Sequence, residues 1–264
     1  MAESRGRQSK ENGVQSGATE PSRDGERPVM AAVQSCYIPW KGYFDLIKAS
    51  DYFVVYDDVQ FVKNHWHNRN RIRTANGIQW LTIPVLHSGK FGQTIEETRI
   101  AAPWARKHWA TLKQAYSRAP FFGLYESRLE NCYAIAGDMD LLSDVNFLFI
   151  QEIASILDLQ TEFSWSRDHK AGGIRTDRLL ALCKELGIAC YLSGPSAKSY
   201  FEAEKFDAAG IGYRWMDYSG YPVYRQLHDA EFDHAVSILD LLFSVGPRAN
   251  DYMKSFPAWK RAAA

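Results

Sequence analysis

Two neighbouring aspartates, Asp57 and Asp58, are the first residues of the chain whose type and position suit chemistry. Residues 53–56 are β-branched or aromatic, which predicts a buried strand that ends at this pair. Open α/β sheets bind their ligands at the carboxyl ends of strands. A carboxylate there can take a proton from an amine or bind a sugar hydroxyl, although it could also cap a loop. Because neighbours in a strand point to opposite faces, we expect at most one of the two to face a given ligand.

A cationic segment, which we predict to be a loop, follows the aspartates. Residues 63–73 contain four lysines or arginines and no acid, together with asparagines, two histidines and a tryptophan. This mixture favours oriented binding of a phosphate or carboxylate, and single-stranded nucleic acid uses a similar combination of arginines and rings. A solvated turn with internal arginine–acid pairs is the alternative. His65 and His67 have the spacing of a metal pair on a strand, but no third ligand has an obvious spacing, so we expect neither a metal nor another cofactor.

Three further parts of the chain carry reactive groups. His108, in a predicted helix, is a candidate general base, with a packed imidazole as the alternative. Ser193 and Gly194 follow another predicted strand, and together with Lys198 they could bind an anion where a helix begins. Cys36 has no base near it in the sequence, and a lone thiol is more often a small buried residue than a nucleophile.

The pattern of elements predicts an α/β fold. Strands are expected at 31–33, 53–56, 79–85, 162–166, 189–192 and 212–216, with a turn at Asn76-Gly77. Helices are expected near 40–49, 103–116, 121–135, 139–158, 176–186 and 236–243. Their alternation indicates a mostly parallel, Rossmann-like sheet with helices on both faces, in three layers, plus a helical insertion at about 103–158. We expect one domain over 30–250 and a C-terminal tail at 251–264.

Composition excludes several classes of protein. The 31 lysines and arginines balance 31 aspartates and glutamates, so we expect no broad nucleic-acid-binding face. No run of about 18 apolar residues is present, so no membrane insertion is expected. Residues 1–29 are polar and lack the apolar core of a signal peptide, which predicts a disordered extension. Four cysteines without CxxC spacing indicate reduced thiols in a cytoplasmic protein.

From Met30 to Gly246 the chain carries a series of motifs in one order. They are Gln34-Ser35, 37–47, 56–60, Lys63-Asn64, Trp66, 68–72, 80–85, 107–109, Tyr116, 119–120, 191–195, 197–198, Tyr224, Gln226 and 237–243. Together they resemble the WbqC-like family, which is found in bacterial O-antigen and related polysaccharide gene clusters. Residues 1–29 lie outside the resemblance, so Met30 is a candidate start of translation.

The resemblance implies a role in O-antigen or surface polysaccharide synthesis, as a glycine-type or other aminoacyl transferase acting on the amine of a nucleotide-linked amino sugar. Its small-molecule partners would be the sugar nucleotide and an acyl donor, such as a thioester or a carrier protein. We expect Asp57, Asp58 or His108 to be the base. The residues expected to bind substrate are Gln34, Tyr37, Trp40, Lys41, Gln60, Lys63, Asn64, Trp66, Asn68, Arg69, Asn70, Arg71, Ser193, Lys198, Tyr224 and Gln226.

Two other functions stay open at this point. An ATP-dependent amide ligase would pass through an acyl-adenylate and release AMP. A non-catalytic module would bind the sugar nucleotide or acyl carrier and form no product. A weaker likeness to nucleotidylyl transferases and pantoate ligases covers the opening strand, loop and helix. Residues 40–43 read Trp-Lys-Gly-Tyr where those enzymes have His-x-Gly-His, which puts their chemistry in doubt.

Overall fold

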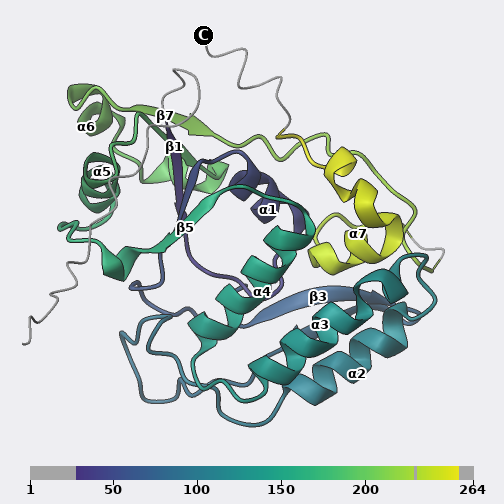
Figure 1. The fold of residues 1–264 in the computed structure, drawn as a ribbon. Coiled ribbons are helices and arrows are strands. Elements are labelled where there is room, and N and C mark those ends of the chain that lie inside the picture. The colour runs from purple at the N-terminus through teal and green to yellow at the C-terminus, as the bar shows by residue number, and fades with distance from the viewer. Residues whose placement is uncertain (1–27, 229–230, 256–264) are drawn as a thin grey trace, which may run out of the picture.

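The computed structural model describes residues 28–228 and 231–255. The N-terminal extension predicted for 1–29 lies almost wholly outside the described residues, as does the tail beyond residue 255. At the centre is a five-stranded parallel sheet with strand order β5-β2-β1-β6-β7 (Figure 1). Its strands are β1 (Val29–Val33), β2 (Tyr52–Val55), β5 (Glu162–Trp165), β6 (Cys190–Ser193) and β7 (Gly212–Trp215).

Helices cover both faces of this sheet, because alternate residues of its strands point to opposite sides. Ala31 and Phe53 belong to the larger core, and Met30 and Val54 to a smaller one on the other face. The larger core includes α1 (Lys41–Lys48), α4 (Leu142–Ile156) and α7 (Ile238–Val245), and the smaller includes α5 (Thr176–Glu185) and α6 (Ala203–Ala208). Figure 1 shows α5 and α6 on one side of β1 and β5, opposite α1 and α4. The predicted α/β fold with a mostly parallel sheet is confirmed.

Between β2 and β5 the chain leaves the sheet. An antiparallel hairpin comes first, formed by β3 (Arg69–Thr74) and β4 (Gly77–Thr82). It turns at the predicted Asn76-Gly77 signal, where Gly77 has a φ of 101° that a residue with a side chain rarely adopts. The segment 63–73, predicted as a loop, is therefore half strand. Next come α2 (Ala105–Tyr116) and α3 (Phe122–Ala136), which lie beside α4 and the hairpin (Figure 1).

Short 3₁₀ helices complete the described chain. They are η1 (Ser166–Asp168), η2 (Pro195–Ser199) and η3 (Gly246–Tyr252). Within the described residues, no helix has the length and apolar character needed to cross a membrane.

The strand order creates a switch point at the carboxyl ends of β1 and β6. From β1 the chain moves to β2 and then β5 on one side, whereas β6 and β7 lie on the other side. The loop that starts at Gln34 and the loop that starts at Gly194 therefore diverge. In open α/β sheets such a point is where ligands bind.

Candidate functional site at the switch point

A cavity of about 770 Å³ lies at the switch point, and we call it the switch-point cavity. Its volume is in the range of small-molecule sites, roughly 300–1,000 Å³. Segments far apart in the chain meet there, including the ends of β1 and β6, the start of α1 and the start of α5. The residues that line it are Ala32, Val33, Gln34, Cys36, Trp40, Tyr43, Leu46, Tyr56, Val59, His65, Trp66, Arg175, Leu179, Tyr191, Ser193, Gly194, Ser196, Ala197, Tyr200 and Tyr218.

Aromatic rings form much of the wall. Trp40 lies immediately before α1, and its ring centroid is 5.1 Å from that of Tyr218. Trp66 lines both this cavity and a smaller one of about 320 Å³ that also includes Trp40 and Cys36. Flat rings of this kind stack well on sugars and nucleobases.

The loop that carries Trp40 is held in an uncommon conformation. Ile38 has a φ of 37°, in the left-handed region that β-branched residues disfavour. The side-chain amide of Asn70 donates to the carbonyls of Tyr37 and Ile38 at 3.0 and 2.9 Å. Asn70, predicted to bind substrate, is buried and positions the loop; it lines the smaller cavity but not the switch-point cavity.

Arg175 is the cation of the cavity wall. It is exposed at the start of α5, and its φ of 51° is again in the left-handed region. Its guanidinium forms no ion pair with any residue that the structure describes. A guanidinium at a helix N-terminus suits a phosphate, because both supply hydrogen-bond donors and positive charge.

His65 contributes the only imidazole among the described lining residues. Burial, and next the nearby Arg69, lower the pKa of His65 below its ordinary value of 6.5. The ring is therefore neutral at pH 7 and can accept a proton. Its neighbour His67 lies behind it, with ring centroids 4.5 Å apart. His67 is buried, its Nδ1 is 3.2 Å from the carbonyl oxygen of Ser35, and burial lowers its pKa to about 4.

The two aspartates after β2 bind different partners and do not line the cavity. Asp57 is buried and accepts hydrogen bonds from the Ser35 backbone N–H at 2.7 Å and from the Ser143 hydroxyl of α4. Burial raises the pKa of Asp57, although the bonds from Ser143 and Ser35 oppose that shift. Asp57 thus ties the loop after β1 to α4.

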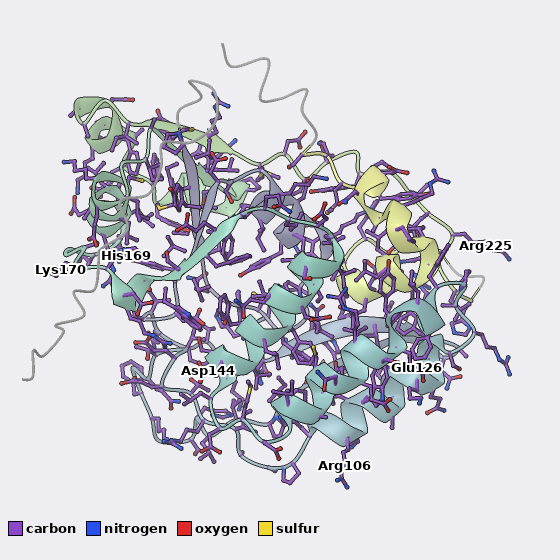
Figure 2. The ribbon with its side chains drawn as sticks, viewed as in Figure 1. Arg106, Glu126, Asp144, His169, Lys170 and Arg225 are labelled. Atoms are coloured by element: carbon purple, nitrogen blue, oxygen red, sulfur yellow. The ribbon has the colours of Figure 1, made fainter. Side chains whose placement is uncertain are left out.

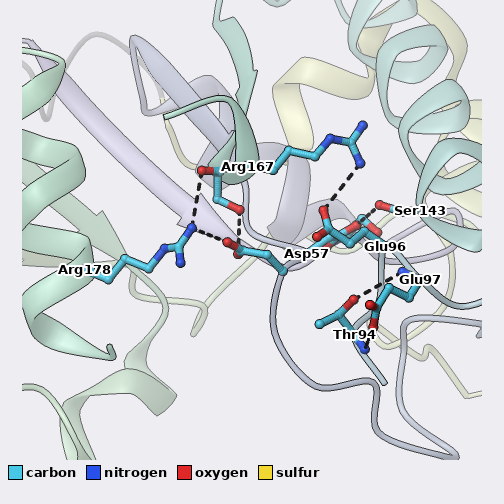
Figure 3. Close-up of polar contacts among 10 residues, drawn as sticks. Asp57, Thr94, Glu96, Glu97, Ser143, Arg167 and Arg178 are labelled. Atoms are coloured by element: carbon cyan, nitrogen blue, oxygen red, sulfur yellow. Dashed lines mark hydrogen bonds and ion pairs between the residues drawn. The ribbon is translucent and has the colours of Figure 1, made fainter. Parts of the chain in front are cut away.

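Asp58 faces α5. It forms an ion pair with Arg178 and accepts a hydrogen bond from the Ser166 hydroxyl at 2.7 Å (Figure 3). The Arg178 guanidinium lies 5.6 Å from the ring centroid of Tyr56, which lines the cavity. Asp58 therefore acts on the cavity wall through Arg178 and Tyr56.

Arg69 fastens the loop before β3 to the hairpin. It donates to the carbonyl oxygen of Asn64 and lies 4.2 Å from the ring of Trp80. Trp80 in turn packs against Trp66, with centroids 5.3 Å apart. This stack holds Trp66 at the cavity, so the arginine predicted to bind phosphate supports an aromatic wall residue.

Other members of the cationic segment bind protein groups. Arg71 forms an ion pair with Asp233 at 3.3 Å and donates to the carbonyl of Ala235 at 2.8 Å. The Asn68 amide donates to the carbonyl of Ile83 at 2.9 Å. These side chains therefore bind groups of the protein, and neither lines the switch-point cavity.

A second buried group lies around α1 and α7. The Lys41 ammonium donates to the Pro222 carbonyl at 3.1 Å and lies 5.3 Å from the Tyr224 ring. Burial lowers the pKa of Lys41 to about 8, against the opposing effects of Asp45 and Asp240. Tyr224 and Gln226 both donate to Asp240, at 2.8 and 2.9 Å. None of these residues lines the switch-point cavity.

His108 and Tyr37 are buried together among the insertion helices. The Tyr37 hydroxyl is 2.9 Å from His108 Nδ1 and 2.6 Å from the Tyr133 hydroxyl. Burial lowers the pKa of His108 to about 4. Both residues lie outside the cavity wall, so their positions favour the packed-imidazole alternative.

Of the residues predicted to bind substrate, the structure brings four together at the switch-point cavity: Gln34, Trp40, Trp66 and Ser193. Gln60 and Lys63 line a separate cavity, and Lys198 is exposed on η2, 6.0 Å from the ring of Trp215.

Sequence reasoning missed Arg175 and considered His65 only as a metal ligand. A signal for Arg175 was present, because two glycines, at 172 and 173, come just before a predicted helix start. Cys36 lines the cavity, but burial and the nearby Asp57 raise its thiol pKa, so a thiolate is disfavoured. In the described part of the chain, no three His, Cys, Asp or Glu side chains are grouped so that they could hold a metal ion.

Comparison with known proteins gives a family and one relative. Residues 34–252 match the WbqC-like protein family. The chain is 44% identical over 226 residues to the uncharacterized protein Rv1507c of Mycobacterium tuberculosis, an alignment that covers 85% of this chain and 97% of that protein. No solved structure matches the chain. Every cavity-lining residue beyond β1 lies within the family match.

Proposed function

Because this chain belongs to the WbqC-like protein family, we propose that it transfers an acyl group of the glycine or aminoacyl type to the amine of a nucleotide-linked amino sugar, in O-antigen or surface polysaccharide synthesis. The observation that carries the proposal is the switch-point cavity. Aromatic rings, hydroxyls, one guanidinium and one neutral imidazole surround a common space there. Each of these groups matches one part of such a substrate.

In this proposal the acceptor binds through three kinds of contact. Trp40 and Trp66 stack on the base or the sugar ring. Arg175, with the N–H groups at the start of α5, binds the phosphates. The Ser193 hydroxyl is available to a sugar hydroxyl.

The chemical step that we propose begins with His65. Its neutral imidazole takes a proton from the sugar ammonium, which frees the amine lone pair. The amine nitrogen attacks the carbonyl carbon of an acyl thioester, so that a C–N bond forms and a tetrahedral intermediate results. The nitrogen then gives up its second proton to water, and the C–S bond breaks. The thiolate leaves with the proton that His65 returns, so the products are a neutral amide and a thiol. No atom changes its oxidation state, so no redox partner is needed.

The test measures substrate binding and product formation separately. We expect UDP- or dTDP-linked amino sugars to bind in calorimetric titrations, and Trp40→Ala or Arg175→Ala to weaken binding at least tenfold with little change in melting temperature. Arg106→Ala, which removes an exposed cation on α2 outside the cavity, is the control (Figure 2). Mass spectrometry of mixtures with glycyl and acyl thioesters should detect the amide product.

Other outcomes contradict acyl transfer from a thioester. A product that forms only with ATP and releases AMP would assign the protein as an amide ligase. Tight binding of the sugar nucleotide without product, across a panel of acyl donors, would assign a binding module. If sugar nucleotides bound equally well to wild type and both variants, the switch-point cavity would not be their binding site.

A further inference from the structure

A second cavity, of about 320 Å³, shares one segment of chain with the switch-point cavity. We call it the Phe91 cavity. Within the segment 59–66, Val59, His65 and Trp66 line the switch-point cavity. The residues between them, Gln60, Phe61 and Lys63, line the Phe91 cavity. The same stretch of chain therefore borders both spaces.

The wall of the Phe91 cavity is held by backbone hydrogen bonds. The Phe61 N–H donates to the carbonyl of Gln93 at 2.8 Å, and the Ile95 N–H donates to the carbonyl of Val59 at 3.0 Å. The turn at 94–97 is stabilised by two hydrogen bonds, because the backbone N–H groups of Thr94 and Glu97 each donate to the other residue's side chain (Figure 3). The lining residues are thus fixed to the segment that carries His65.

Positive charge and apolar surface are both exposed at this cavity. Lys63 and Lys90 are exposed, and neither forms an ion pair with a residue in the described part of the chain. Phe91 is 101% exposed, which is unusual for a large aromatic side chain. Its ring offers an apolar surface to a ligand or partner.

A buried acceptor in the same wall also lacks a partner. The Gln93 Nε2 group donates to the carbonyl of Glu97 at 3.2 Å, but Gln93 Oε1 is buried and accepts no hydrogen bond from the residues that the structure describes. An unmet buried acceptor costs on the order of 1–3 kcal/mol, so such groups are usually satisfied by something. A ligand N–H would satisfy this one.

We infer that the Phe91 cavity binds the phosphopantetheine arm of the thioester acyl donor, an assignment that rests on the proposed acyl transfer. The arm has a chemical group to match each of three features of the cavity: its positive charge, its buried acceptor and its exposed ring. Its phosphate suits Lys63 and Lys90, an amide N–H suits Gln93 Oε1, and its alkyl part suits Phe91. Donor and acceptor would then occupy two cavities that share the segment carrying His65.

The experiment measures binding of the arm apart from turnover. Phosphopantetheine is titrated against wild type, Lys63→Ala/Lys90→Ala and Gln93→Met, which keeps the length of the side chain but removes its acceptor. We expect the double variant to weaken the arm's Kd at least tenfold and Gln93→Met about fivefold, with the Kd for the sugar nucleotide changed less than twofold. Arg106→Ala/Lys184→Ala removes the same charge from exposed positions outside both cavities and should change neither Kd.

The source of the arm is separated by two further titrations. Coenzyme A tests a free donor, and an acyl carrier protein in its apo and holo forms tests a protein-bound one. Binding of coenzyme A that is lost in the double variant supports the inference and identifies a free donor. Binding of the holo but not the apo carrier protein, again lost in the double variant, supports it and identifies a protein-bound donor.

Three results would overturn the inference. The first is a Kd for phosphopantetheine that is the same in the double variant and in wild type, and the second is competition between phosphopantetheine and the sugar nucleotide. The third is that phosphopantetheine binds neither wild type nor the double variant, while wild type binds anionic vesicles and the double variant does not. The two proposals also fail separately. If amide product forms while all variants bind phosphopantetheine as wild type does, the assignment of the donor cavity is wrong and acyl transfer stands. If the arm binds as expected but no amide forms with any amino sugar, the cavity stands and acyl transfer is wrong.

Discussion

The surroundings of three histidines, His65, His67 and His108, distinguish their roles. Burial lowers the pKa of His65, His67 and His108, so that all three are neutral at pH 7. His67 and His108 are buried against the Ser35 carbonyl and the Tyr37 hydroxyl. His65 alone among them lines the switch-point cavity. At the residue scale, access rather than basicity selects the candidate base.

The first prediction concerns the pH profile of acyl transfer. Because the proton on His65 must be absent for it to act as a base, kcat/KM should fall as pH drops through a value below 6.5. His65→Gln should remove this limb and lower kcat/KM about 100-fold, the scale of a lost general base. His169→Gln, a histidine outside the cavity, should retain the limb. An unchanged profile in His65→Gln would exclude His65 as the base.

The second prediction concerns stability against pH. His67 and His108 have folded-state pKa values of about 4, below the ordinary 6.5, so the unfolded chain binds more protons between these values. Their contribution to stability is complete above pH 6.5 and is lost as pH falls toward 4. Each histidine should lower the free energy of unfolding by up to about 1.4 kcal/mol per pH unit in this window.

Urea unfolding at several pH values between 7 and 4 measures this slope. His67→Gln and His108→Gln should each be less stable at pH 7 and show a shallower dependence on pH. A slope as steep in both variants as in wild type would mean that other groups cause the acid sensitivity.

At the scale of elements, the start of α1 sets the shape of the cavity wall. A Cβ atom at Gly42 would lie 2.3 Å from the nearest atom of the Trp40 ring, so only glycine lets the indole lie against the helix. Gly42→Ala should push the Trp40 ring out of place, weaken sugar-nucleotide binding at least tenfold and cost about 1–3 kcal/mol of stability.

Gly123 provides the matched control for this change. It lies in α3, and a Cβ there would meet nothing within 4 Å. Gly123→Ala should stabilise the protein by up to about 1 kcal/mol, because alanine is the better helix former, and leave binding unchanged. Calorimetric titration and thermal unfolding of both variants test the pair. Equal binding by Gly42→Ala and wild type would show that the position of Trp40 does not matter.

At the scale of the whole molecule, Asp45 joins α1 to two distant segments. It is fully buried and accepts hydrogen bonds from the Tyr221 hydroxyl at 2.6 Å and from the backbone N–H groups of Ser255 and Lys254 at 2.7 and 3.1 Å. Tyr221 and Trp40 also pack together, with centroids 5.9 Å apart. The carboxylate therefore connects the end of the described chain to the helix beside the cavity.

Asp45→Asn should lower the melting temperature by about 4–8 °C, because an amide cannot accept all three hydrogen bonds and its NH₂ faces other donors. Hydrogen exchange at 254–255 should accelerate. Asp251→Asn, which removes an exposed ion pair with Arg248, should change the melting temperature by no more than about a degree. If the two variants melted alike, Asp45 would not be holding these segments together.

The sequence by itself determined the fold class and most of its elements. Short apolar runs at 31–33 and 53–56 predict buried strands, because a strand covered on both faces needs apolar side chains on both. The structure has these strands at Val29–Val33 and Tyr52–Val55. The Asn76-Gly77 turn and the helices beyond residue 103 follow equally local rules. Ser193 was predicted to bind a ligand from its place after a strand, and Gln34 from the family resemblance, and both line the cavity.

Only the tertiary structure decided which polar residues are free to meet a ligand. Sequence spacing cannot show that Asp58 pairs with Arg178, 120 positions away, or that Arg71 pairs with Asp233. Nor can it show that Arg175, at the start of a later helix, lines the same cavity as Trp40 and His65. An ion pair depends on distance in space, and strand order sets that distance here by bringing β6 and α5 beside the loop after β1. Local rules predicted the elements, whereas their long-range packing selected the site.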